Sequence, residues 1–398
     1  MPDSKTDSTL VNHPPEAPVP VGNRPLVTPI YQSVKFEFDD LEDTLEFLRG
    51  DRPGYFYTRA SNPTTRQLEL LCAQMQGRDD CLVTGSGVAA ISHTLLALTK
   101  QGDHVLCFVE TYNPTRYLIR RLLGRFGVTC TMLSVEDLPG IERALSSTPT
   151  RLVLFESPTN PMTKIADIEA ITRLAQAHGA LTLMDNTFAG LHQHGEYPVD
   201  IFVHSLTKYA SGTGDVMGGA VIARADIIRA MHNEFSTLGG ILDPHAAWLM
   251  LRGLKTYYVR YRAQSERAMA AARMLEQHPQ VERVHYPGLE SHPRHTLAKQ
   301  QMRDFGTVVT LDLKSAAAAA RFADALKLFA ITASLGATES LVVPPQMMSG
   351  RDLSTEQSGI SGITDSTVRL SIGLEEADDL IADLRQALDA AATVSVEI

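Results

Sequence analysis

Short apolar runs alternate with longer helix-like stretches through the middle of the chain, and this alternation limits the fold more than any other feature. The runs, each bounded by Gly, Pro, Asp or Asn, are Cys81–Thr84, His104–Val109, Leu152–Phe155, Leu181–Met184, Ile201–His204 and Gly219–Ala223. Their continuous apolar character predicts strands that are buried on both faces. The stretches that predict helices between them include Val88–Leu98, Tyr117–Phe126 and Ile165–His178. Together they predict an α/β fold with a mainly parallel sheet.

The pattern changes near residue 249. Leu249–Gln277 predicts one long connecting helix. The elements expected beyond it are the strands Thr307–Leu313, Leu341–Val343 and Val368–Ile372, the helix Ala316–Leu326, and a final amphipathic helix with Leu380, Ile381, Leu384 and Leu388 at helical spacing. We therefore expect a smaller C-terminal α+β domain after the parallel sheet.

The length of 398 residues is enough for two or three domains. We expect an N-terminal arm over residues 1–62, a ligand-binding α/β domain over 63–256 and the α+β domain over 257–398. Residues 1–25 are rich in Pro, Asp, Ser and Thr, which predicts disorder. No apolar stretch is long enough to span a membrane, and no signal pattern begins the chain, so we expect a cytoplasmic protein.

The charge and the metal-ligand residues exclude several classes of function. Lys plus Arg is 36 and Asp plus Glu is 46, and the net charge of −10 argues against nucleic acid or an anionic membrane as the main partner. The four cysteines form no C-x-x-C pair, so we expect free buried thiols. His192 and His194 have the spacing of metal ligands but lack a third, so we expect a solvated loop and no metal.

Three groups that can carry chemistry follow predicted strands. Lys208 lies in a Ser-Leu-Thr-Lys string before a glycine-rich loop, where burial would make its amine a nucleophile; the alternative is a surface lysine. Asp185 ends a strand and can face a ligand crevice, or it can cap a helix. Gly87 and Val88 begin a predicted helix that can bind an anion, or they form a simple turn. Pyridoxal phosphate (PLP) needs such an amine, carboxylate and phosphate site.

The chain resembles the Cys/Met-metabolism, or trans-sulfuration, family of PLP-dependent enzymes over about nine-tenths of its length. The strings that carry this resemblance are Tyr57–Arg59, Ser61–Thr64, Glu156–Pro161, Asp185–Thr187, Ser205–Lys208, Ser334–Gly336, Glu339–Leu341 and Arg369–Gly373. The resemblance implies PLP fold type I, the aspartate aminotransferase-like fold. It also implies homotetramers built from dimers that share their sites, with part of the arm crossing to the neighbouring subunit.

The resemblance also implies a role for each matching residue. Lys208 would form the internal aldimine and act as the base, and Asp185 would pair with the pyridinium nitrogen. The phosphate would be held by Gly87, Val88, Ser205 and Thr207, and by Tyr57 and Arg59 of the neighbouring subunit. Tyr112 would stack on the ring and, like Tyr57, could protonate a leaving group, while Asn160, Ser334 and Arg369 would bind the substrate. Taken singly, Tyr112 could be core, Asn160 a turn residue and Arg369 part of a surface ion pair.

Residues around the predicted site bear on the reaction. Phe56 is the residue that methionine γ-lyases have there, whereas cystathionine-handling members tend to have an acidic one. Pro114 occupies the place of the methionine γ-lyase cysteine, and Phe235-Ser236 occupy that of a Lys-Asp pair. These differences favour a substrate whose distal group differs from that of methionine. Asn113–Arg116 resembles some cystathionine β-lyases, but those usually have tryptophan at the place of Leu335.

We therefore expect a γ-elimination lyase that removes first the α-proton and then the β-proton. The candidate substrates are methionine, homocysteine, cystathionine and an oxygen-linked analogue such as canavanine. The alternatives are a γ-replacement transferase (cystathionine γ-synthase or O-acylhomoserine sulfhydrylase), a cystathionine β-lyase and a non-catalytic cofactor-binding protein.

Overall fold

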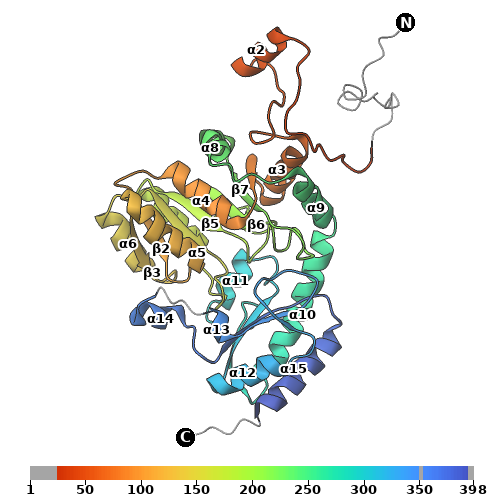
Figure 1. The fold of residues 1–398 in the computed structure, drawn as a ribbon. Helices are drawn as coiled ribbons and strands as arrows, with labels where there is room; N and C mark the ends of the chain where they lie inside the picture. The colour runs from red at the N-terminus through yellow and green to blue at the C-terminus, as the bar shows by residue number, and fades with distance from the viewer. Residues whose placement is uncertain (1–24, 349–352, 393–398) are drawn as a thin grey trace.

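The computed structural model describes residues 25–348 and 353–392, and Figure 1 shows two sheets that follow one another along the chain. The larger sheet has seven strands in the order β1-β7-β6-β5-β4-β2-β3. They are β1 (Asp80–Thr84), β2 (His104–Phe108), β3 (Thr129–Leu133), β4 (Leu152–Glu156), β5 (Leu181–Asp185), β6 (Ile201–Ser205) and β7 (Gly219–Ala223). Neighbours from β3 through β6 run parallel, and only β7 pairs antiparallel, with β1 and β6. The predicted mainly parallel α/β sheet is confirmed.

The α-helices associated with this sheet are α3 (Pro63–Gln76), α4 (Gly87–Leu98), α5 (Asn113–Tyr117), α6 (Leu138–Ser147), α7 (Ile168–Ala177) and α8 (Ala225–Leu238). Two of them, α4 and α7, confirm the predicted stretches Val88–Leu98 and Ile165–His178. The stretch predicted as one α-helix from Tyr117 to Phe126 is instead a π-helical turn, Leu118–Leu122, followed by a 3₁₀ turn, Leu123–Phe126, that ends at the left-handed Gly127.

The connection to the second sheet is two helices, α9 (Pro244–Leu254) and α10 (Tyr257–Glu276), so the single predicted helix is wrong. The break has a local cause at Gly253. Its carbonyl oxygen accepts a hydrogen bond of 2.9 Å from the Arg260 guanidinium and one of 3.2 Å from the Thr256 N–H. A tighter turn thus replaces the regular helical bonding at that carbonyl.

The second sheet and its helices make up the C-terminal part. The sheet has the order β10-β11-β12-β9-β8, and its strands are β8 (Val281–His285), β9 (Val308–Leu313), β10 (Ala330–Ile331), β11 (Leu341–Val343) and β12 (Thr367–Ser371). The helices are α11 (His295–Gln301), α12 (Ala316–Ala325), α13 (Pro345–Met348), α14 (Thr355–Ser361) and α15 (Ala377–Ala392). The smaller α+β unit is therefore confirmed, while its exact boundaries stay a prediction. Within the described residues, no helix is both long and apolar enough to cross a membrane.

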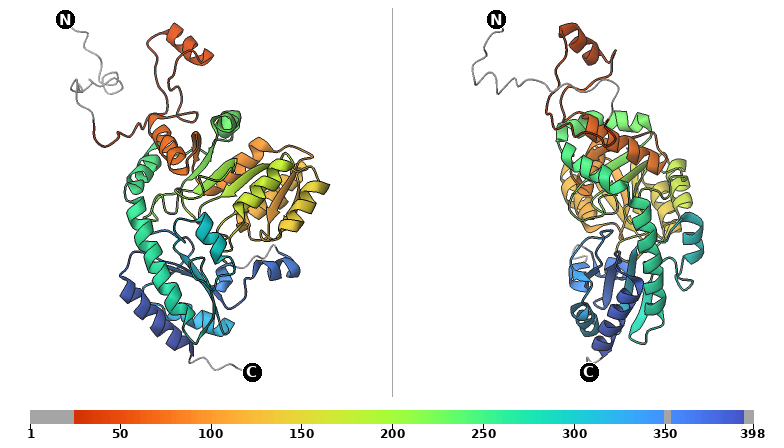
Figure 2. Two further views of the ribbon diagram at one scale, coloured as in Figure 1. Left: turned by 180° about the vertical axis from the view of Figure 1, so that it is seen from behind. Right: turned by 90° about the vertical axis from the view of Figure 1, so that its right-hand side faces the viewer.

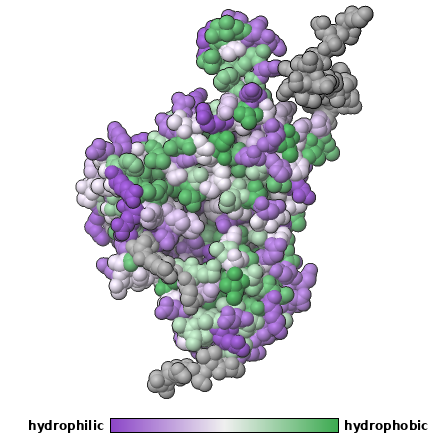
Figure 3. Space-filling view, in the orientation of Figure 1, coloured by the Kyte–Doolittle hydropathy of each residue, from purple (hydrophilic) through white to green (hydrophobic). Residues whose placement is uncertain are grey.

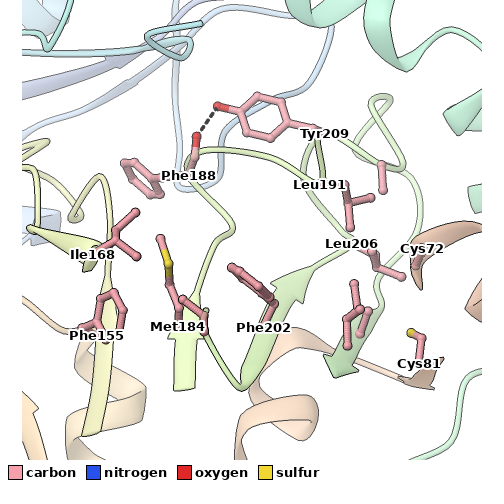
Figure 4. Close-up of a cluster of buried hydrophobic side chains, with 14 of the residues drawn as sticks. Cys72, Cys81, Phe155, Ile168, Met184, Phe188, Leu191, Phe202, Leu206 and Tyr209 are labelled. Carbon is pink, nitrogen blue, oxygen red and sulfur yellow. Dashed lines mark hydrogen bonds between the residues drawn. The ribbon is translucent and has the colours of Figure 1, made fainter. Parts of the chain in front are cut away.

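A continuous apolar core supports the strands that carry the predicted site. Phe155, Met184 and Phe202 come from the neighbouring strands β4, β5 and β6 and pack in one cluster (Figure 4). Above them, the Tyr209 hydroxyl donates to the Phe188 carbonyl oxygen at 3.5 Å. Because close-packed interiors move little, the carboxyl ends of these strands form a rigid base for functional side chains.

The N-terminal arm leaves the rest of the molecule. Its helix α2 (Leu41–Arg49) projects away from both sheets in every view of Figures 1 and 2. The arm exposes apolar side chains, including Leu41, Leu48 and Phe56, and Figure 3 shows hydrophobic residues on this projection. The disorder predicted for residues 1–25 falls, apart from Pro25, outside the described residues.

Candidate active site

A cavity of about 510 Å³ opens at the carboxyl ends of the parallel strands, where residues from the C-terminal part meet them. Open α/β sheets bind their ligands at this edge. Ten of the predicted site residues line it, namely Gly87, Val88, Tyr112, Asn160, Asp185, Ser205, Thr207, Lys208, Ser334 and Arg369. Residues from widely separated parts of the chain thus converge on one space.

One end of the cavity has the features of an anion site. Helix α4 begins at Gly87, so its first main-chain N–H groups and the positive end of its dipole are there. A Cβ atom at Gly87 would lie 2.8 Å from the Ser205 Cβ, so only glycine allows this close approach. Thr207 is tied to the same place, because its hydroxyl accepts from the Gly218 N–H at 3.1 Å. Helix amides and two hydroxyl groups can together hold a phosphate.

Gly87→Ala is expected to weaken cofactor binding by about tenfold or more, since overpacking a tight contact typically costs about 1–3 kcal/mol. The affinity of the apoprotein for PLP, measured by fluorescence titration, checks this. Gly124→Ala is the matched control, because a Cβ at Gly124 would meet nothing within 4 Å. Equal affinities of the two variants would contradict the role given to Gly87.

Lys208 supplies an amine at the centre of the cavity. Its Nζ donates to the Ser334 hydroxyl at 2.9 Å. Burial lowers the pKa of Lys208, the nearby Arg369 charge lowers it further, and Asp185 opposes both. A lowered pKa makes the neutral, nucleophilic amine more accessible near neutral pH. The alternative of an ordinary surface lysine is therefore wrong.

Asp185 ends β5 and accepts a hydrogen bond of 3.0 Å from the Thr187 N–H. Burial raises the pKa of Asp185, while its bonds with Thr187 and the nearby Lys208 lower it. The carboxyl group of Glu156 lines the same cavity from the neighbouring strand. Glu156 lies in a motif that the sequence analysis quoted, but no role was predicted for it, because the sequence alone does not show which strands are neighbours.

Arg369 is a buried cation with an available donor. Its two Nη atoms donate to Asn160 Oδ1 at 2.9 Å and to the Ser334 carbonyl oxygen at 2.7 Å, whereas its Nε has no hydrogen-bond partner. Burial lowers the pKa of Arg369 to about 10, so it stays charged at neutral pH. The side chain is 6% exposed, which rules out the alternative of a surface ion pair. A carboxylate is the natural partner of such a group.

Tyr112 is 41% exposed at the cavity, so the alternative of a core tyrosine is wrong. Burial raises the pKa of its hydroxyl, and the nearby carboxyl groups of Glu156 and Asp185 raise it further. The hydroxyl is therefore protonated at neutral pH and can donate a proton.

Tyr57 and Arg59 lie outside the cavity of their own chain. The Arg59 guanidinium lies 5.6 Å from the centre of the Tyr57 ring, and both side chains are exposed on the arm. The prediction that they complete the site of a neighbouring subunit stays a prediction.

The solvated loop expected at His192 and His194 is wrong. His194 is fully buried and its Nδ1 bonds Asn186 Oδ1 at 2.7 Å, while His192 Nδ1 bonds the Tyr257 hydroxyl at 2.8 Å. The partner of His194 lies eight residues earlier and that of His192 lies on the distant helix α10, so a hydrogen bond to one ring nitrogen of each histidine accompanies its burial. Across 25–348 and 353–392, no cluster of three His, Cys, Asp or Glu side chains could hold a metal ion.

The cavity residues fit PLP. The start of α4 with Ser205 and Thr207 suits the phosphate, Asp185 suits the ring nitrogen, and Lys208 supplies the amine. The approach of Gly87 to Ser205 is so tight that a Cβ at Gly87 would meet Ser205 itself, one of the residues that suit the phosphate.

Comparisons with known proteins agree with this fit. Residues 8–389 match the family model described as Cys/Met metabolism PLP-dependent enzyme. An L-methionine γ-lyase from Fusobacterium nucleatum subsp. polymorphum is 40% identical over 371 residues, which cover 92% of this chain and 93% of that protein. An O-succinylhomoserine sulfhydrylase from Pseudomonas aeruginosa is 38% identical, over 91% of this chain and 90% of its own length.

A solved structure has the same fold. It is a cystathionine γ-synthase from Xanthomonas oryzae pv. oryzae in complex with aminoacrylate and cysteine, and it superimposes with a TM-score of 0.87 at 35% identity, over 93% of this chain and 94% of that one. This likeness confirms the expected fold class. The chain belongs to the Cys/Met metabolism family of PLP-dependent enzymes, and pyridoxal 5′-phosphate is its cofactor.

Proposed function

We propose that the enzyme catalyses γ-elimination on a γ-substituted α-amino acid, consuming one water and releasing ammonia, 2-oxobutanoate and the protonated γ-substituent. The candidate substrates are methionine, homocysteine, cystathionine and an oxygen-linked analogue such as canavanine. The observation that carries the proposal is the convergence of a base, Lys208, an acid, Tyr112, and a carboxylate-binding group, Arg369, on one cavity. The similarity to methionine γ-lyases supports elimination in particular.

Each group has a defined task in this reaction. Arg369 binds the substrate carboxylate and so fixes the α-carbon near Lys208. PLP held by Lys208, Asp185 and the start of α4 would supply the electron sink that makes the α-proton removable. Lys208 Nζ, whose pKa is lowered by burial, takes the α-proton, gives that proton up again, and as a neutral amine then takes a β-proton. Tyr112, whose pKa is raised by burial, donates a proton to the leaving group.

The apolar part of the cavity lining supports an uncharged γ-substituent. Pro114, Met347, Met348 and Ile363 line the cavity with apolar atoms. Glu110 also reaches the cavity, but its carboxylate bonds the Lys164 ammonium at 2.9 Å. A thioether suits this lining better than a second ammonium group does.

A γ-replacement transferase is the alternative function. It is favoured by the similarity to O-succinylhomoserine sulfhydrylase and cystathionine γ-synthase, whose identities of 38% and 35% are little lower than that of the methionine γ-lyase. Both reactions begin with the same two proton transfers, so the residues named above serve either.

A substrate panel separates these reactions. Purified holoenzyme is given methionine, homocysteine, cystathionine, canavanine or O-succinylhomoserine, with and without cysteine or sulfide, and 2-oxobutanoate and pyruvate are measured separately. The proposal predicts 2-oxobutanoate from at least one substrate without any added nucleophile. Little 2-oxobutanoate without a nucleophile, together with a replacement product once cysteine or sulfide is added, would identify the transferase. Pyruvate from cystathionine, with no 2-oxobutanoate from any substrate, would identify a β-lyase.

We also propose that the working enzyme is a homo-oligomer, at least a dimer and by family resemblance a tetramer, in which Tyr57 and Arg59 complete a neighbour's site. Their position on an exposed apolar arm, outside their own cavity, supports this. In a mixed dimer of Arg59→Ala and Lys208→Ala chains, one site then receives both substitutions and the other site receives neither. Co-expression of the two variants should therefore rebuild intact sites, up to about one quarter of all sites in randomly mixed dimers.

The control for this complementation is each variant expressed alone, purified and assayed in the same way. Turnover that rises only in the co-expressed sample supports the shared site. Folded hybrid oligomers with no more turnover than the separate variants would contradict it.

A cytoplasmic location is part of the proposal. All four cysteines are free thiols, and reducing compartments keep thiols free. Fractionation of the source cells, with the enzyme followed by its activity, tests the location.

A further inference from the structure

Glu156 and Asp185 are paired carboxyl groups at the base of the cavity. They end the adjacent parallel strands β4 and β5, where they are opposite each other in the register. Paired residues of neighbouring strands project to the same side of the sheet, and both line the cavity. Glu156 is 6% exposed, so its carboxyl group is almost entirely shielded from water.

The Glu156 carboxyl group supports two loops of the proposed site. Its Oε1 accepts the main-chain N–H of Tyr112 at 2.5 Å, and the main-chain N–H of Asn160 bonds the same carboxyl group. Tyr112 lies in the loop after β2, and Asn160 in the turn after β4. Asn160 in turn accepts from Arg369. One side chain thus fixes the proposed ring-stacking residue and a partner of the proposed substrate-binding arginine.

The surroundings decide which of the two carboxyl groups carries charge, because neighbouring carboxyl groups in a site shielded from water each disfavour ionisation of the other. Asp185 is near the Lys208 amine and receives hydrogen bonds from Thr187. Three groups surround the Glu156 carboxyl group: Asp185 on β5, Tyr112 in the loop after β2, and Arg116 on α5.

The Nη1 of Arg116 donates to the carbonyl oxygens of Val109 and Thr111, and the Arg116 charge lowers the pKa of Glu156 less than burial and Asp185 raise it. Glu110, in the loop after β2, accepts hydrogen bonds from the Lys164 ammonium and from the Ser134 hydroxyl. Burial raises the pKa of Glu156 well above its usual range, and Asp185 raises it further, while the N–H groups of Tyr112 and Asn160 and the charge of Arg116 oppose this shift without cancelling it.

We propose that Glu156 is a positioning residue that works as a neutral carboxylic acid, holding the main chain of Tyr112 and Asn160 while the negative charge stays on Asp185. A charge on Glu156 would add a second anion next to the cofactor ring and divide its electrostatic pairing between two carboxylates. The inference rests on the cofactor site proposed above, but it does not depend on whether elimination or replacement follows.

The test compares Glu156→Gln, which keeps a neutral hydrogen-bond acceptor, with Glu156→Met, which has similar size and no oxygen. Glu156→Gln should bind PLP within about threefold of the wild type, and Glu156→Met at least about tenfold more weakly, because buried N–H groups lose their acceptor. The pH at which the absorbance of the bound cofactor changes should be the same in Glu156→Gln and the wild type. Infrared spectra at neutral pH should show a protonated carboxyl band that Glu156→Gln lacks.

Two results would overturn the inference. If Glu156 were an anion, Glu156→Gln would move the spectral transition to lower pH, since removal of a negative charge disfavours the protonated cofactor link, and the infrared band would be missing. If Glu156→Met behaved like the wild type, the residue would position nothing. Should Glu156→Met fail to fold, the Glu156→Gln spectra still decide the charge. If the cofactor still attaches to Lys208 in these variants, the cofactor site itself is intact, and a contrary result then concerns only the role given to Glu156.

Discussion

Lys208→Ala is expected to reduce kcat at least about 10³-fold, because one substitution removes both the nucleophilic amine and the proposed base for two proton transfers. The variant should also lose the visible absorbance of the lysine-linked cofactor. The loss follows from the position of the half-buried Lys208, which lines the cavity and whose Nζ bonds Ser334 at 2.9 Å. Absorbance spectra and steady-state turnover of the purified variant measure both effects.

Lys100→Ala is the matched control for Lys208→Ala, since Lys100 is exposed and does not line the cavity. It should keep the absorbance and the turnover of the wild type. Thermal unfolding of both variants shows whether either has lost its fold. A folded Lys208→Ala protein with the absorbance of the wild type would contradict the assignment of the lysine.

Arg369→Lys is expected to lower kcat/KM by about 10²–10³-fold, which corresponds to about 3–4 kcal/mol of lost transition-state binding. The planar guanidinium bonds Asn160 and the Ser334 carbonyl oxygen at once and still has its Nε available for the substrate. An ammonium group keeps the charge but cannot make this set of planar contacts. Because carboxylate binding persists through the reaction, KM should rise more than kcat falls.

The control for Arg369→Lys is Arg321→Lys at an exposed position on α12, which should leave both constants unchanged. A substrate analogue with a carboxamide in place of its α-carboxylate should react equally slowly with wild type and Arg369→Lys. Wild-type KM for the carboxylate substrate in Arg369→Lys would contradict the proposed role of the arginine.

Much of the fold could be predicted because buried parallel strands appear in the sequence as short, continuous apolar runs. Leu152–Glu156 and Ile201–Ser205 are apolar on both faces apart from their ends, and both are strands where expected. Thr129–Leu133 was missed, since this strand lies at the sheet edge, is only partly buried and mixes polar with apolar residues. The break between α9 and α10 was missed because it depends on a bond from Arg260 that periodicity does not reveal.

The site was predictable to the extent that its residues lie in motifs at strand ends. Lys208 and Asp185 follow apolar runs, and the structure places both in one cavity. The pairing of Glu156 with Asp185 was missed because it depends on which strands are neighbours in the sheet. The burial of His194 was also missed, because its partner Asn186 comes near only when the turn between the two residues has folded.

The measurement that tests the account most directly is mapping of the cofactor after reduction. Holoenzyme is treated with borohydride, which fixes PLP to the lysine that holds it, and the digested protein is analysed by mass spectrometry. The structure predicts one modified lysine, Lys208, because it supplies the amine beside the helix start and Asp185 in the cavity. Stoichiometric label on another lysine, such as Lys164 or Lys255, with Lys208 unmodified, would contradict the account.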